Sequence, residues 1–110
     1  MANAERGETR LSAGGREYVL RYTINSLCEL EDALGQGFNT IAAMMADPEK
    51  LRLKTLRAVV WAGLLDKQPE ATAPLAGEII GEIGTPAAMA AVAQAFSNAF
   101  AKGEADAARP

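Results

Sequence analysis

The segment that decides the fold is Asn25-Ser-Leu-Cys-Glu-Leu-Glu-Asp-Ala-Leu-Gly35, because both ends of a short helix are marked in it. Asn25 or Ser26 can cap the first turn, and Ser26 with Glu29 has the spacing of a capping box. Gly35 accepts the left-handed geometry that ends many helices. The apolar residues between these ends have the spacing of one buried helical face: Leu27, Leu30 and Leu34. We therefore expect a compact helix that packs along its leucine face.

A β-hairpin is expected just before this helix. Two β-like runs, residues 9–13 and 16–23, flank Gly14-Gly15. Glycine reaches the positive φ angles that the favoured two-residue turns require. Alternate residues of the second run form one apolar face: Tyr18, Leu20 and Tyr22. Because an isolated hairpin is only marginally stable in water, we expect this face to pack on the helices that follow.

Four further helices are expected downstream, over about 39–46, 48–65, 73–83 and 85–102. The start of the second is the best marked, because Asp47-Pro48-Glu49 combines a capping aspartate, a first-position proline and a first-turn acid. Its apolar residues form one face: Leu53, Leu56, Val60 and Leu64. Thr72 and Gly84 mark the two ends of the third helix. Val59 and Trp61 widen the apolar surface of the helix at 48–65 beyond this face, which places that helix at the centre of the fold.

Together these elements predict an α+β fold, in which an N-terminal β-hairpin packs on a bundle of four or five helices and most of the chain is helical. With 110 residues, 49% of them apolar and 23% charged, the chain has the size and composition of one globular domain. We expect that domain over residues 9–102, with a flexible N-terminus at 1–8 and a disordered tail at 103–110.

The composition argues against several classes of function. The chain has no histidine and a single cysteine, which excludes histidine-dependent nucleophiles, His-containing metal sites and thiolate zinc sites. We expect no metal, no cofactor and no enzymatic activity. A net charge of −3 argues against nucleic acid as a partner. The single cysteine, Cys28, cannot form an intrachain disulfide, so a reducing, cytoplasmic location is expected. No apolar run approaches the length of a membrane span, and the polar N-terminus lacks a signal core.

Carboxylates are the remaining candidates for chemistry. Three lie on the first helix, at Glu29, Glu31 and Asp32, and Glu78 and Glu82 are four residues apart on a later one. Paired carboxylates support acid–base catalysis only where burial or neighbouring groups separate their pKa values. Carboxylates are seldom buried, so we interpret both groups as solvated helix faces. Cys28, beside Leu27, is expected to be a small core residue, because free cysteine is usually buried.

A basic stripe is the strongest candidate for a binding surface. Lys50, Lys54 and Arg57 lie at the spacing of one face of the helix predicted at 48–65. Cations near a helix N-terminus oppose the helix dipole, so an acidic group is expected to offset them. One interpretation is pairing with acids of the same chain or simple solvation. The other is a partner-binding site that includes Trp61, with an acidic partner or the first helix of a second copy.

The order of these features resembles a family found in gene transfer agents and phage tail clusters, labelled tail tube or tail assembly chaperone proteins. The resemblance covers about residues 8–101. It rests on four segments: Gly15-Arg-Glu-Tyr-Val-Leu-Arg-Tyr-Thr23, Asn25-x-x-Cys28-x-Leu30-Glu31 with Gly35, Leu56-Arg57-x-x-x-Trp61-Ala62-Gly63-Leu64, and Ala76-Gly77-Glu78-Ile79-Ile80 with Gly84.

The resemblance implies a non-catalytic protein of a bacterial host that acts in building a tail tube around a tape-measure protein. We expect a tail assembly chaperone, because a tube subunit normally needs an extended sheet that closes with its neighbours. Its implied partners are the tape-measure protein or tail tube subunits, or further copies in a homo-oligomer. Two alternatives remain: a structural tube or connector component kept in the particle, and a small regulatory binding module unrelated to particles.

Overall fold

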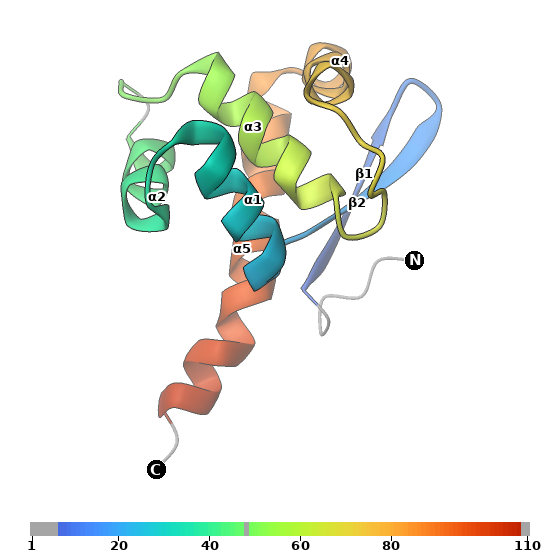
Figure 1. Ribbon diagram of the computed structural model, residues 1–110. Coiled ribbons are helices and arrows are strands. Elements are labelled where there is room, and N and C mark those ends of the chain that lie inside the picture. The colour runs from blue at the N-terminus through green and yellow to red at the C-terminus, as the bar shows by residue number, and fades with distance from the viewer. Residues whose placement is uncertain (1–6, 48, 109–110) are drawn as a thin grey trace.

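A hairpin followed by five helices makes up the computed structural model, which describes residues 7–47 and 49–108. The elements in chain order are β1 (Glu8–Ala13), β2 (Arg16–Arg21), α1 (Ile24–Leu34), α2 (Phe38–Ala46), α3 (Leu53–Leu64), α4 (Ala73–Ile83) and α5 (Thr85–Ala108). In Figure 1, α3 lies between α1 and α4, and α5 runs behind them. The predicted α+β class, a hairpin on a predominantly helical body, is confirmed.

The hairpin is antiparallel, with Ala13 paired to Arg16 across Gly14 and Gly15. Both glycines have positive φ angles, 57° and 78°, as the predicted tight turn requires. The predicted apolar face is also confirmed, since all three of its side chains are buried: Tyr18, Leu20 and Tyr22. This face packs on α3 and α5, which supply the partner that a two-stranded sheet needs.

Helix α1 begins earlier than predicted, because a different pair of residues forms its capping box. The N-cap is Thr23, whose Oγ1 accepts the Ser26 N–H at 3.1 Å, while Ser26 Oγ accepts the Thr23 N–H at 2.7 Å. Ser26 therefore takes the third helical position rather than the cap, and the predicted pairing with Glu29 is wrong. The predicted end is confirmed, since Gly35 has the left-handed geometry at φ 65°.

Helix α3 begins at Leu53, five residues later than predicted. Asp47 instead organises a separate turn, in which its carboxylate accepts the Glu49 N–H at 3.0 Å and its carbonyl accepts the Lys50 N–H at 3.0 Å. The chain then extends through Arg52, which is the N-cap of α3. The predicted first-position proline, Pro48, lies outside the described residues.

The late start changes the apolar face of α3. Leu56, Val60 and Leu64 are buried as predicted, whereas Leu53 is 69% exposed. Leu53 is the first residue of the helix and projects beyond the part that neighbouring elements cover. As predicted, α3 is central, because it packs against β2, α1, α4 and α5.

Helix α4 has the predicted ends. Thr72 Oγ1 accepts the Leu75 N–H at 3.2 Å, and Gly84 follows the last turn with φ 89°. Helix α5 continues to Ala108, beyond the predicted end near Lys102 and into the segment expected to be disordered. The many alanines of this segment favour helix propagation. Residues 109–110 lie outside the described part.

At the other end of the chain, Glu8 is the first residue of β1 and is buried, one residue before the expected start of the domain. Residues 1–6 lie outside the described part.

Cys28 is exposed, so its prediction as a core residue is wrong. Cys28 follows Leu27 directly, so it is turned about 100° around the helix from Leu27, away from the face that Leu27 and Leu30 form.

An aromatic cluster joins the far ends of the sequence. The rings of Tyr22 and Phe96 are 4.5 Å apart between centroids, and Phe38 lies 5.6 Å from Phe100. It ties α2 and the residue that follows β2 to α5. Among the described residues no single helix is long and apolar enough to cross a membrane. Helix α4 reaches that length and composition only together with α5 as far as Phe100, and these two helices are bent by 115° relative to each other.

Candidate functional site

The three cations of the predicted stripe do not share one helix. Lys50 lies in the turn that Asp47 organises, whereas Lys54 and Arg57 lie on α3. All three side chains are exposed. They are connected through two neighbouring hollows of the surface, because Lys54 lines both, Lys50 lines one and Arg57 lines the other.

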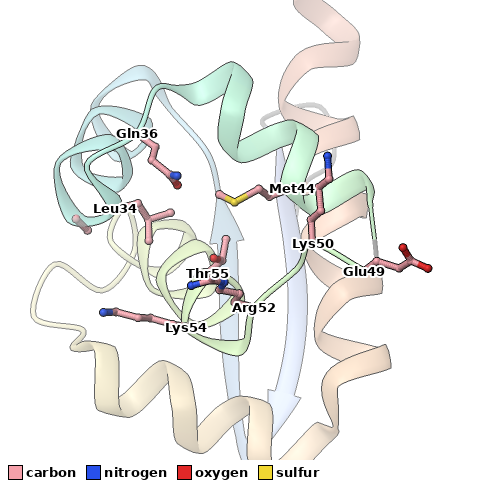
Figure 2. A pocket seen from close by; sticks show the side chains of 9 residues that line it. Leu34, Gln36, Met44, Glu49, Lys50, Arg52, Lys54 and Thr55 are labelled. Carbon is pink, nitrogen blue, oxygen red and sulfur yellow. The ribbon is translucent and has the colours of Figure 1, made fainter.

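The first hollow, which we name the basic cleft, has a volume of about 640 Å³. It lies between the end of α1, α2 and the start of α3. Its lining comprises Ala33, Leu34, Gln36, Met44, Glu49, Lys50, Arg52, Lys54 and Thr55. Figure 2 shows Leu34, Gln36 and Met44 pointing into the space between the helices, with Lys54 on one side of the view and Lys50 and Glu49 on the other. Three cations against one acid give the cleft a positive surface.

The second hollow, which we name the α3–α4 groove, has a volume of about 730 Å³ and a more apolar lining. Its residues are Leu53, Lys54, Arg57, Gly77, Ile80, Gly81, Gly84 and Thr85. No acidic residue belongs to this lining. Sequence reasoning missed Leu53 and the glycines as surface features, although the i, i+4 spacing of Gly77 and Gly81 already places these two on one face of the helix predicted at 73–83.

None of these cations has an ion-pair partner among the described residues. Ion pairs in this part of the chain join Arg10 to Glu17, Arg21 to Asp66 and Lys67 to Glu8. The carboxylate of Glu31 accepts the Phe38 N–H at 2.8 Å and so caps α2. The interpretation in which the stripe pairs with acids of α1 is therefore not supported, and the cations face solvent.

The start of α3 concentrates positive charge further. Its N-cap, Arg52, makes no side-chain capping hydrogen bond, and the first turn contains no acidic residue. The unsatisfied N–H groups of a helix N-terminus carry a partial positive charge. Lys54 adds a full charge at the same place. An acidic group of a binding partner would therefore be stabilised at the start of α3.

Trp61 is separate from the cations. Its side chain is half-buried, and its Nε1 donates a hydrogen bond to the Ala71 carbonyl at 2.9 Å. This bond holds the connection between α3 and α4 against α3. Trp61 lines neither the basic cleft nor the α3–α4 groove. The structure thus brings Lys50, Lys54 and Arg57 into one region and places Trp61 outside it.

The predicted carboxylate pairs lie on solvated faces. Glu29, Asp32, Glu78 and Glu82 are all exposed. Within residues 7–47 and 49–100, no group of three His, Cys, Asp or Glu side chains has an arrangement that could hold a metal ion. The described titratable group with a clearly altered pKa is Tyr22, where burial raises the pKa of the phenol. Its hydroxyl lies in the core, 2.7 Å from the Val59 carbonyl, and serves packing.

The comparisons with known proteins agree with the resemblance seen in the sequence. No curated protein and no solved structure matches the chain. A family model described as phage tail tube protein, GTA-gp10, matches residues 6–102. The match contains the hairpin, α1 to α4 and most of α5, and therefore both hollows. The chain belongs to this family of phage tail proteins.

Proposed function

We propose that this protein is a non-catalytic tail assembly chaperone, which binds the tape-measure protein or tail tube subunits while a phage-like tail is built and then leaves. The observation that carries the proposal is the group of exposed, unpaired cations Lys50, Arg52, Lys54 and Arg57 around two hollows. Such a surface suits reversible binding of an acidic protein segment, because complementary charge speeds association and selects the partner.

The small sheet also supports a chaperone. A subunit that builds a tube through its sheet needs strands that pair with those of neighbours until the ring closes. Among the described residues the sheet has two strands, and one of its faces is buried on α3 and α5. Most of the surface is helical, which suits side-chain docking rather than strand pairing.

The alternative is a structural component that stays in the particle. The family description, which names a tail tube protein, favours it. A helical subunit would then be held in the tube by side-chain contacts between helices. Membership of a phage tail family speaks against the third alternative, a regulatory module unrelated to particles.

The basic cleft is the partner site we propose, with Lys50, Arg52 and Lys54 meeting carboxylates of the partner and Met44 offering an adaptable apolar contact. We propose no metal, cofactor, nucleic acid or membrane as a ligand. The action is expected in the cytoplasm of the bacterial host, before the tail is complete.

Quantitative mass spectrometry of purified particles tests the proposal, with an abundant structural protein of the same particles as the internal standard. A chaperone is expected in the host lysate and nearly absent from the particles. Presence in a fixed ratio of several copies per tail would overturn the chaperone role and establish the structural alternative.

A further inference from the structure

We propose that copies of this protein associate head to tail, with the outer face of α1 of one copy lying in the α3–α4 groove of the next. The inference goes beyond the proposed function, because it holds whether the protein leaves the particle or stays in it. It starts from two exposed large apolar side chains, Ile24 at 75% and Leu53 at 69%. Among the described residues, neither side chain belongs to the buried core or to the partly buried residues that pack on it.

The groove is shaped for the close approach of another helix. Gly77 and Gly81 leave about one turn of α4 without side chains, roughly 6 Å long at the usual rise of a helix, and Gly84 follows the end of the helix. A Cβ at Gly77 would lie 3.4 Å from Arg57 Cδ, so the stem of Arg57 borders this strip. A Cβ at Gly81 would meet no atom within 4 Å, so the packing of this chain gives no reason for glycine there. A glycine inside a helix destabilises it relative to alanine. Close approach of a partner is a physical reason to keep it.

The outer face of α1 offers a ridge that can lie in this groove. Ile24, Cys28 and Asp32 follow one another at i, i+4 and i+8, so they form a single ridge about 12 Å long. Asn25 and Glu29 lie beside it. All five residues are exposed. The ridge begins with an isoleucine and a small thiol, which suit a glycine floor bordered by Leu53 and Ile80.

The charges of the two surfaces are complementary. The groove carries Lys54 and Arg57 and no acid, whereas the α1 face carries Glu29 and Asp32 and no base. None of these four side chains has an ion pair or hydrogen bond within the described residues. When α1 of one copy docks, its carboxylates neutralise the positive start of α3 of the next.

The two surfaces lie on opposite sides of α3, because α1 packs on one side of it and α4 on the other (Figure 1). A copy can therefore use both surfaces at once. Such a contact between two different surfaces produces rings or open filaments rather than closed dimers. One helix in one groove buries less surface than a stable dimer needs, so the contact of a single pair is weak.

A cross-linking experiment tests this arrangement directly. In Gly81→Cys each chain carries one thiol on the α1 face, the natural Cys28, and one in the groove. Disulfide formation requires Cα atoms within about 7 Å. Oxidation of the concentrated protein with oxidised glutathione is expected to give a ladder of dimers, trimers and larger species. The matched control is Ala93→Cys, which places the second thiol on an exposed position of α5. A ladder no stronger than that of the control would overturn the proposal.

A charge exchange gives an independent measurement. Glu29→Lys with Asp32→Lys makes the α1 face basic, and Lys54→Glu with Arg57→Glu makes the groove acidic. Each double variant is expected to self-associate at least about tenfold more weakly than the parent in sedimentation velocity, because like charges then meet. Mixing the two is expected to restore association, since each α1 face again meets a groove of opposite charge.

Melting curves confirm that both double variants are folded before they are mixed. Failure of the folded variants to associate on mixing would overturn the proposal. The mass spectrometry of particles reports a different property, so failure of the self-association and failure of the chaperone role are distinguishable.

Discussion

The ring of Tyr22 lies directly against Gly63, so closely that a Cβ at Gly63 would be 2.8 Å from both Cζ and Oη of the tyrosine. The same hydroxyl donates a hydrogen bond to the Val59 carbonyl at 2.7 Å. These contacts join the residue that follows β2 to the second half of α3. They fix the hairpin on the central helix, and therefore the start of α1, which follows Tyr22 by two residues.

We predict that Gly63→Ala destabilises the fold by about 1–3 kcal/mol, because an added methyl group overpacks this contact. Gly81→Ala is the matched control, since it is also a helix-interior glycine but faces open space. It is expected to raise the free energy of unfolding by about 0.5–1 kcal/mol. Urea unfolding of the two variants measures both values, and a neutral Gly63→Ala would contradict the close contact.

We predict a loss of stability at alkaline pH that depends on Tyr22. Burial raises the pKa of its phenol in the folded protein, whereas the unfolded chain releases this proton near pH 10. Above pH 10 the unfolded state therefore binds fewer protons, and the free energy of unfolding falls by up to about 1.4 kcal/mol per pH unit. Below that pH the effect is absent.

The variant Tyr22→Phe isolates this effect. It lacks the hydrogen bond to Val59 and is expected to be less stable by about 0.5–1.5 kcal/mol at neutral pH. Above pH 10 its stability is expected to fall less steeply than that of the parent protein. Parallel slopes in urea unfolding between pH 9 and 11 would show that Tyr22 does not titrate on unfolding.

We predict that Trp61→Phe loosens the connection between α3 and α4. The phenyl ring keeps most of the packing but lacks the N–H that donates to the Ala71 carbonyl. The expected loss is about 1 kcal/mol of stability, with faster hydrogen exchange confined to residues 65–72. Unchanged exchange in this segment would mean that the bond does not hold it.

We predict that Thr23→Ala destabilises the protein by about 0.5–2 kcal/mol, because it removes the capping hydrogen bond of α1. Glu29→Ala serves as the comparison, since Glu29 occupies the third position of the box suggested by the sequence. It is exposed and is expected to change stability by no more than about 0.5 kcal/mol. The reverse order of the two melting temperatures would favour the box at Ser26 over the one at Thr23.

We predict that Lys50→Glu weakens binding of the tape-measure protein and reduces its salt dependence, mainly through a slower on-rate. Lys50 lines the basic cleft and not the α3–α4 groove, so self-association is expected to be unaffected. Arg16→Glu, the same charge change at an exposed position of the hairpin, is the control. Equal binding by both variants at two salt concentrations would exclude the cleft as the partner site.

Much of the fold follows from short stretches of sequence. Two adjacent glycines between alternating residues specify the hairpin, because positive φ angles and a period of two are local properties. Thr72 and Gly84 define α4 for the same reason. The predicted start of α3 is wrong because the carboxylate of Asp47 can accept backbone N–H groups in an isolated turn as well as at a helix N-cap. The sequence does not distinguish the turn from the cap.

The residue types of the candidate site were also visible in the sequence, namely Lys50, Lys54 and Arg57 with no acid between them. Helical spacing gives the angle of a residue around its own axis, but not which side of the helix other elements cover. Only the packing of α1 and α4 on the two sides of α3 decided that Leu53 and Cys28 are exposed and that Trp61 lies apart from the cations. The tertiary structure also set Lys54 and Arg57 beside the glycines of α4, because that contact joins segments that are 20 or more residues apart.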